Sequence, residues 1–153
     1  MADFTRTSRI VGVNELDPPL LAAIKSTLDR HEIGIVLLDV LKACRTESVP
    51  TKGRRWVVGP KRRAHTTAIV LTPTWLVWAT DAGDSPIVSL CRLTDAEVRR
   101  FAAPGSDDTG LEVTGFLDPS ASQRATAFVP LDGGLAGNEF ATLVLATAAE
   151  ARR

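Results

Sequence analysis

Two consecutive apolar runs in the middle of the chain constrain its fold more than any other feature. Residues His65–Thr72 and Trp75–Thr80 are rich in β-branched and aromatic side chains, and only Pro73 and Thr74 separate them. Such runs are typical of β-strands, and a short connection that contains proline is typical of a tight turn. The sequence therefore predicts that the fold is built around a β-hairpin.

Other segments of the chain predict further strands and two helices. The additional strands, of which the first is expected near a sheet edge, cover residues 42–49, 87–91, 95–101, 111–117 and 125–129. A helix is expected over residues 18–31, where Pro18 follows the N-cap residue Asp17. A closing helix is expected over residues 138–151. Residues 1–16 show no sustained period, so we expect an arm that frays or lies against the domain.

Seven short strands with a closing helix give an α+β order, and 153 residues fit a single domain. The chain has no alternation of strand, helix and strand, which excludes the doubly wound nucleotide-binding folds. A hydrophobic share of 44% and a charged share of 24% exclude the disordered and collagen-like classes. Because the sequence contains no long apolar run and no signal-peptide core, we expect a cytoplasmic protein.

Charge is distributed unevenly along the chain. The net charge is zero, because 18 basic residues balance 18 acidic ones. Between Lys42 and Arg63, however, eight basic residues accompany a single acid, Glu47, so this stretch carries 8 − 1 = +7 and the remainder of the chain carries −7. The uneven distribution of charge therefore matters more than the zero total.

The most informative part of this stretch is residues 52–63, called here the basic segment. It places Trp56 and two valines between two clusters of basic side chains. Three interpretations are open: a long hairpin whose charges are merely solvated, a surface where Trp and Arg side chains anchor a protein partner, and a loop that inserts into an anionic membrane. Nucleic-acid binding is disfavoured, because the chain has no Tyr and no second aromatic residue near the segment for base stacking.

Trp75 and Trp78 lie three residues apart in a predicted strand, and therefore on opposite faces of the sheet. They cannot both enter one core. One possibility is that one Trp is exposed beside an open sheet edge, where it could help to recognise a partner strand that adds to the sheet. The other is that the N-terminal helix covers this Trp. We prefer the second interpretation.

The sequence nominates no catalytic residue, metal ligand or cofactor. His31 and His65 belong to no metal-binding motif, and no Gly-x-Ser-x-Gly elbow occurs. The two cysteines, Cys44 and Cys91, are too few for a disulfide framework and lack zinc-site spacing, so we expect two buried thiols. An enzyme is therefore the less favoured interpretation.

Three stretches of the chain have a pattern in common with a known family: Thr67–Trp78, Cys91–Val98 and Gly134–Arg153. Together they resemble the pleckstrin-homology-like (PH-like) superfold, in its bacterial and GRAM-related branch. The resemblance covers residues 36–153 and implies a seven-stranded, two-sheet β-barrel or sandwich that a C-terminal helix caps. Residues 1–35, the arm and the extra N-terminal helix, lie outside it.

The resemblance also implies a role for the first hairpin loop. Family members that bind phosphoinositides often carry a K-x(n)-K/R-x-R pattern there, and this chain has Lys52-x(8)-Lys61-x-Arg63 at that place. We therefore expect a non-catalytic binding module or scaffold that engages a protein partner. The alternative is a peripheral membrane adaptor that binds anionic lipid headgroups through the same loop, and self-association stays open. The ligand-binding residues expected in either case are Lys52, Arg54, Arg55, Trp56, Lys61, Arg62 and Arg63.

Overall fold

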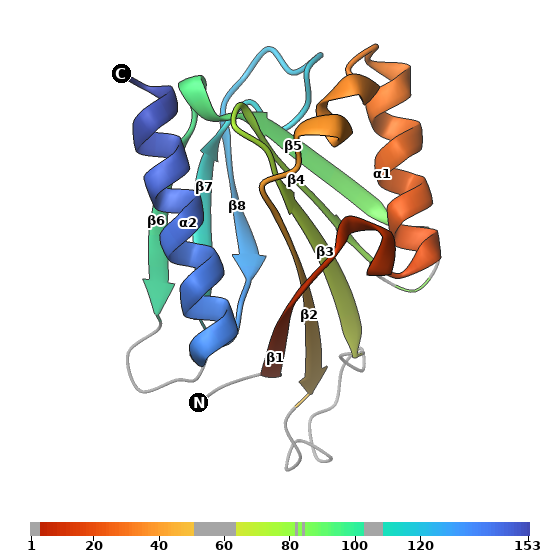
Figure 1. Ribbon diagram of the computed structural model, residues 1–153, viewed down its shortest axis with the longest axis vertical. Coiled ribbons are helices and arrows are strands. Elements are labelled where there is room, and N and C mark those ends of the chain that lie inside the picture. Colours follow the sequence, from red (N-terminus) through yellow and green to blue (C-terminus); the bar gives the residue numbers. More distant parts are fainter. Residues whose placement is uncertain (1–3, 51–63, 82, 84, 103–108) are drawn as a thin grey trace.

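The computed structural model describes residues 4–50, 64–81, 83, 85–102 and 109–153, which form eight strands and two α-helices (Figure 1). The strands are β1 (Phe4–Val11), β2 (Lys42–Pro50), β3 (His65–Leu71), β4 (Trp75–Thr80), β5 (Ile87–Arg92), β6 (Glu97–Ala102), β7 (Thr109–Gly115) and β8 (Ala125–Pro130). The helices are α1 (Pro18–Arg30), α2 (Leu135–Ala151) and the short 3-10 turns η1 (Val13–Glu15), η2 (Gly34–Asp39) and η3 (Leu93–Asp95). All seven expected strands are present, with bounds within two residues of those expected.

The predicted central hairpin is confirmed as β3 and β4. The strands pair antiparallel, with Ile69 opposite Trp78. The Thr72 hydroxyl closes the turn, because it accepts a 2.9 Å hydrogen bond from the backbone N–H of Trp75 and a 3.3 Å bond from that of Thr74. A short polar side chain thus adds to the 2.9 Å backbone bond from the Thr72 N–H to the Trp75 carbonyl, which is the usual use of Thr in turns.

The strands form two separate antiparallel sheets. The first has the order β1-β2-β3-β4-β5 and the second the order β6-β7-β8. Among the described residues no hydrogen-bonded strand pair joins the two sheets, so the expected two-sheet α+β arrangement is confirmed and a closed barrel is not formed.

The described part of the arm expected over residues 1–16 lies against the domain, and its residues Phe4–Val11 form a strand, β1, that was not predicted. This strand pairs with β2 along its whole length, from Phe4 opposite Pro50 to Val11 opposite Ala43. Because β1 takes the edge position, β2 is an interior strand and not the edge strand that its polar sequence suggested. The polar side chains of β1 suit an edge strand that is only partly covered.

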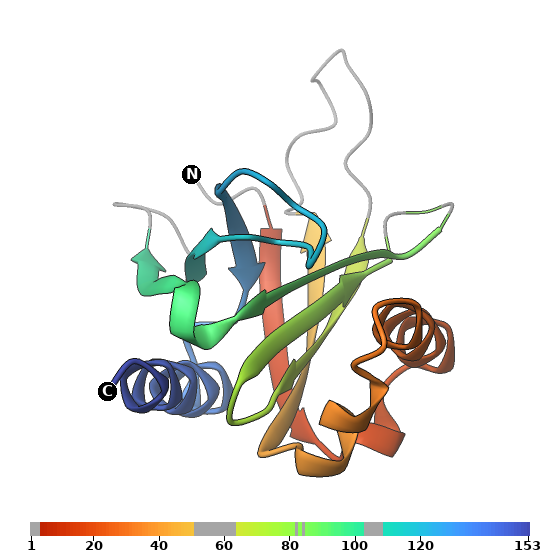
Figure 2. The same cartoon turned by 90° about the horizontal axis from the view of Figure 1, so that it is seen from above.

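Both faces of the five-stranded sheet are buried, each in its own apolar cluster. One cluster places Trp78 with Phe140 and Val144 of α2 and with residues of the second sheet. The other places Trp75 with Ile24 and Leu28 of α1. Figure 2 shows α1 and α2 on opposite sides of this sheet.

The two tryptophans confirm this arrangement. Trp75 and Trp78 point to opposite faces and retain only 8% and 4% of their exposed surface. The preferred interpretation, in which the N-terminal helix covers one of them, is therefore correct, and the exposed alternative is wrong.

Within the described residues, no helix has the length and apolar character needed to cross a membrane.

Replacing Phe140 with Ala should lower the free energy of unfolding by about 3–5 kcal/mol, because its fully buried ring fills the space between the sheets and α2. Urea denaturation measures this loss. Leu135→Ala on the same helix is the matched control, since Leu135 is 89% exposed and its truncation should change stability by less than about 0.5 kcal/mol. Equal losses from the two substitutions would contradict the packing of α2 described here.

Candidate functional site

The seven residues predicted to bind a ligand, Lys52, Arg54, Arg55, Trp56, Lys61, Arg62 and Arg63, lie outside the described residues. The structure does describe the strands on either side of them. β2 ends at Pro50 and β3 begins at His65, and the pairing of Ser48 with His65 brings the two strand ends side by side. The basic segment therefore joins two interior strands of the five-stranded sheet.

Beside these strand ends lies a hollow of about 290 Å³. Its polar lining includes the carboxylates of Glu47 and Asp81 and the imidazole of His65. The ring of His65 also meets the edge of the Phe4 ring, with 5.1 Å between centroids. The described surroundings of these strand ends thus offer acidic and aromatic groups, together with the guanidinium of Arg6, which lies 5.4 Å from the centre of the Phe4 ring.

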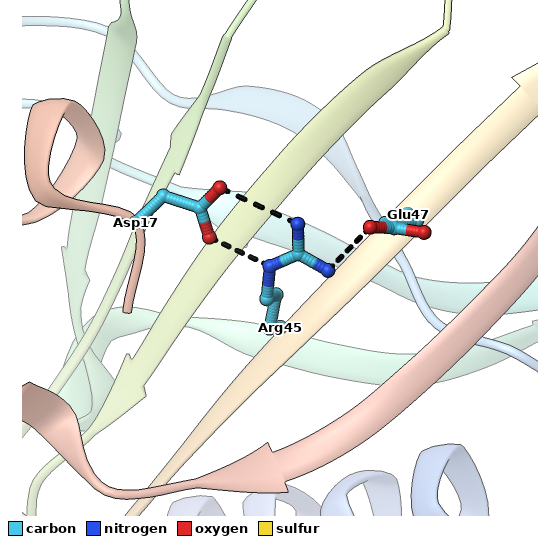
Figure 3. Close-up of polar contacts among 3 residues, drawn as sticks. All are labelled: Asp17, Arg45 and Glu47. Atoms are coloured by element: carbon cyan, nitrogen blue, oxygen red, sulfur yellow. Dashed lines mark hydrogen bonds and ion pairs between the residues drawn. The ribbon is translucent and has the colours of Figure 1, made fainter. Parts of the chain in front are cut away.

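Arg45, one of the eight basic residues counted in the sequence, is held by two carboxylates (Figure 3). Its Nε donates to Asp17 Oδ1 at 2.6 Å and its Nη1 donates to Glu47 Oε1 at 2.6 Å, while Nη2 lies 3.4 Å from Asp17 Oδ2. The hydrogen bonds to Asp17 and then to Glu47 raise the pKa of Arg45. This guanidinium fixes the start of α1 to β2 and is not free to bind a ligand.

A second polar cluster fixes α2 to the other side of β2. The Ser8 and Thr46 hydroxyls lie 2.8 Å apart, and the Asp132 carboxylate accepts a 2.8 Å bond from the backbone N–H of Ser8. The same carboxylate accepts bonds from the N–H groups of Gly134 and Gly137 at the start of α2. A Cβ at Gly137 would collide with the Asp132 backbone carbonyl, so this close approach requires glycine.

Both cysteines are buried and free, as expected. Burial raises the pKa of the Cys44 thiol from 9.0 to about 11, although hydrogen bonds with Thr46 and Ser8 partly oppose this shift. Burial raises the pKa of the Cys91 thiol from 9.0 to about 12. Neither thiol is therefore prepared to act as a nucleophile near neutral pH.

A hollow of about 280 Å³, called here the Arg92 hollow, lies at the end of the sheet opposite Pro50 and His65. Arg92 is the cross-strand neighbour of Trp75, and its guanidinium carbon lies 5.2 Å from the centre of the Trp75 ring. The lining comes from the start of β4, the end of β5, η3 and the connection between β7 and β8, and it includes Trp75, Arg92, Asp95, Phe116, Asp118 and Pro119.

Arg124 and Asp118 hold the wall formed by the β7–β8 connection. Arg124 stacks on the Phe116 ring at 5.7 Å and donates to the backbone carbonyl of Asp95 at 2.7 Å. Asp118 accepts hydrogen bonds from the hydroxyl and N–H of Ser120, which are the main cause of its lowered pKa, and its Oδ2 lies 3.6 Å from His31 Nε2. The walls of the hollow are therefore tied both to η3 and to the end of α1.

The Arg92 hollow was not predicted from the sequence. Trp75 was notable there only for the face of the sheet it occupies, and neither Arg92 nor Phe116 was a candidate. Aligning β4 against β5 in hairpin register would have paired Trp75 with Arg92, because the two are direct cross-strand partners. The contribution of Phe116 and Asp118 had no comparable signal, since it depends on how the second sheet packs.

Neither a family model nor a curated protein nor a solved structure shows significant similarity to this chain. Among the described residues, no group of three or more His, Cys, Asp or Glu side chains is placed to hold a metal ion.

The Asp17–Arg45 pair should contribute measurably to stability. A double-mutant cycle with Asp17→Asn and Arg45→Gln should give a coupling of about 1 kcal/mol, because the pair is doubly hydrogen-bonded and only 32% and 23% exposed. The control cycle uses Arg99→Gln and Glu112→Gln, where Arg99 is 76% exposed, and should give less than about 0.5 kcal/mol. Denaturation in low and high salt measures both, and equal couplings would refute the assigned role of Arg45.

The two thiols should resist modification in the folded protein. At pH 8 a disulfide reagent such as dithionitrobenzoate should leave both unmodified until denaturant is added, because only the thiolate reacts. Their raised pKa values also predict that stability falls as pH rises above about 9, where the thiols of the unfolded chain ionise and those of the folded protein do not. Rapid labelling of the native protein would contradict the burial of the two thiols.

Proposed function

We propose that the protein is a non-catalytic binding module of PH-like fold that engages an acidic surface of a protein partner through the basic segment. The strand order supports the PH-like part of the proposal. β2–β5 form a four-stranded antiparallel meander, β6–β8 form a second sheet, and α2 follows the last strand, an order like that of the PH-like superfold. β1 and α1 are then additions on the edge and on the outer face.

The observation that carries the proposal is the way the sheet holds the ends of the basic segment. β2 and β3 pair without interruption from Lys42 opposite Leu71 to Ser48 opposite His65, and both strands are interior. Between these strands the sequence supplies six basic residues, one Trp and no acid over residues 51–63. Trp and Arg side chains on a rigid support are the residue types that dominate protein–protein binding energy.

Arg45 supports this reading by its separation from the rest of the basic stretch. Because Asp17 and Glu47 neutralise it, the positive charge that remains available is concentrated in residues 52–63. Arginine forks pair well with carboxylates of a partner protein. A second candidate function, binding of anionic lipid headgroups, rests on the pattern Lys52-x(8)-Lys61-x-Arg63 at the first hairpin loop.

The proposal predicts selective loss of binding when the basic segment is changed. The variant Trp56→Ala/Lys61→Glu/Arg63→Glu should lose proteins that the native chain retains from a lysate at physiological salt. The control Lys25→Glu/Arg153→Glu makes the same two charge reversals at exposed positions of α1 and of the C-terminus, and should retain them. Affinity capture with quantitative mass spectrometry measures the difference.

Flotation with neutral and anionic vesicles separates the two candidate functions. The native chain should stay in solution with both vesicle types at physiological salt. If the native chain floats with anionic vesicles and the triple variant does not, the lipid function replaces the protein-binding one. If the triple variant and the control behave alike in capture and in flotation, the basic segment is not the binding surface and the proposal fails.

A further inference from the structure

Among the described residues, the guanidinium of Arg92 lies over the Trp75 ring and has no partner that satisfies its charge. Within the part of the chain that the structure describes, its interaction is the 5.2 Å contact with the Trp75 ring, and no hydrogen bond or ion pair engages its donors. Stacking on an aromatic face restricts the guanidinium plane and leaves the N–H donors at its edge directed away from the ring. Such an arrangement is prepared to bind a planar anion with two parallel hydrogen bonds.

We propose that the Arg92 hollow is a second binding site, which takes a carboxylate of a peptide through Arg92 and an adjacent apolar side chain on Phe116. This site is separate from the one proposed for the basic segment. Trp75 begins β4 and Arg92 ends β5, whereas Pro50 and His65 lie at the other end of the same sheet. Substitutions in one site should therefore leave binding at the other site unchanged.

The carboxylates of the hollow decide which anion fits. Asp95 and Asp118 share the lining with Arg92, so an incoming dianion such as a phosphate monoester faces two negative charges beside the single Arg92 cation. A carboxylate carries one charge, and the peptide N–H next to it can donate to Asp95. The Asp95 side chain has no hydrogen bond among the described residues, while Asp118 is already engaged by Ser120.

The apolar part of the hollow suits one side chain of a peptide. Phe116 is 38% exposed, and Pro119 lies on the same wall. The Arg124 stack holds the Phe116 ring from outside the lining, so this wall is supported before any ligand binds. A volume of about 280 Å³ accommodates a single residue with its terminal or side-chain carboxylate rather than a folded partner element.

The test uses small probes and the assigned indole N–H signal of Trp75 in nitrogen–proton correlation spectra. Acetyl-glycyl-phenylalanine presents a terminal carboxylate, its C-terminal amide removes that charge, and acetyl-glutamyl-phenylalanine amide presents a side-chain carboxylate instead. Phenyl phosphate is the dianionic probe. At least one carboxylate peptide should shift the Trp75 signal at concentrations up to about 10 mM and bind about tenfold more tightly than the amide. The better of the two identifies the source of the carboxylate.

Substitution at Arg92 completes the test. Arg92→Gln should weaken binding at least about tenfold, and Arg92→Lys should weaken it less, because it keeps the charge and loses the fork. Arg99→Gln, at an exposed arginine of β6, and Lys61→Glu/Arg63→Glu in the basic segment should both bind the probe like the native chain. If Arg92→Gln fails to fold, the comparison of Arg92→Lys with the native chain decides.

Four results would overturn the inference. They are no shift of the Trp75 signal with any carboxylate probe, equal binding of the amide, tighter binding of phenyl phosphate, and native-like binding by a folded Arg92→Gln variant.

Discussion

Burial of both faces of the β3–β4 hairpin is the constraint on which the rest of the structure depends. Ile69 and Trp78 point to one side of the sheet, and Val70 and Trp75 point to the other, and all four are nearly inaccessible to water. An antiparallel sheet commonly leaves one face to solvent, and its strands then alternate between apolar and polar residues. Here both faces are apolar, so a separate element must pack against each of them. α1 supplies one cover, and α2 together with the second sheet supplies the other.

The two covers are fixed to the sheet through neighbouring residues of one strand. Arg45 points to the α1 side of β2 and binds Asp17, the residue that caps α1. Thr46 points to the other side and contacts Ser8, which is bonded to Asp132 just before α2. A helix start is where a carboxylate is best placed, because unpaired backbone N–H groups gather there. Asp132 meets this preference by accepting from the N–H groups of Gly134 and Gly137, whereas the Asp17 carboxylate at the start of α1 is bonded to Arg45. The two contacts of β2 start from the adjacent residues Arg45 and Thr46.

The parts of this fold that sequence could predict are those with strong local patterns. Runs or periods of apolar residues predict the β3–β4 hairpin, α1 after Asp17, and α2. β1 was not predicted, because its residues are mostly Thr, Ser and Arg and its stability comes from pairing with β2, which is distant in sequence. The same difference between local patterns and long-range contacts explains why one candidate site was predicted and the other was not. The basic segment is a local cluster of charge and is visible in the sequence, whereas the stacking of Arg92 on Trp75 depends on strand register and its other neighbours depend on the packing of the second sheet.

The contact between Ser8 and Asp132 also sets an order in which the chain can complete its fold. The two residues are 124 positions apart, so β1 meets this partner only when nearly the whole chain is present. Until then β1 is held by its pairing with β2 alone, and the Ser8 N–H lacks its Asp132 partner. Contacts of such long range form late and slow the final step of folding. In a nascent chain that ends before residue 132, the first strand can therefore pair with β2 but cannot yet bond to Asp132.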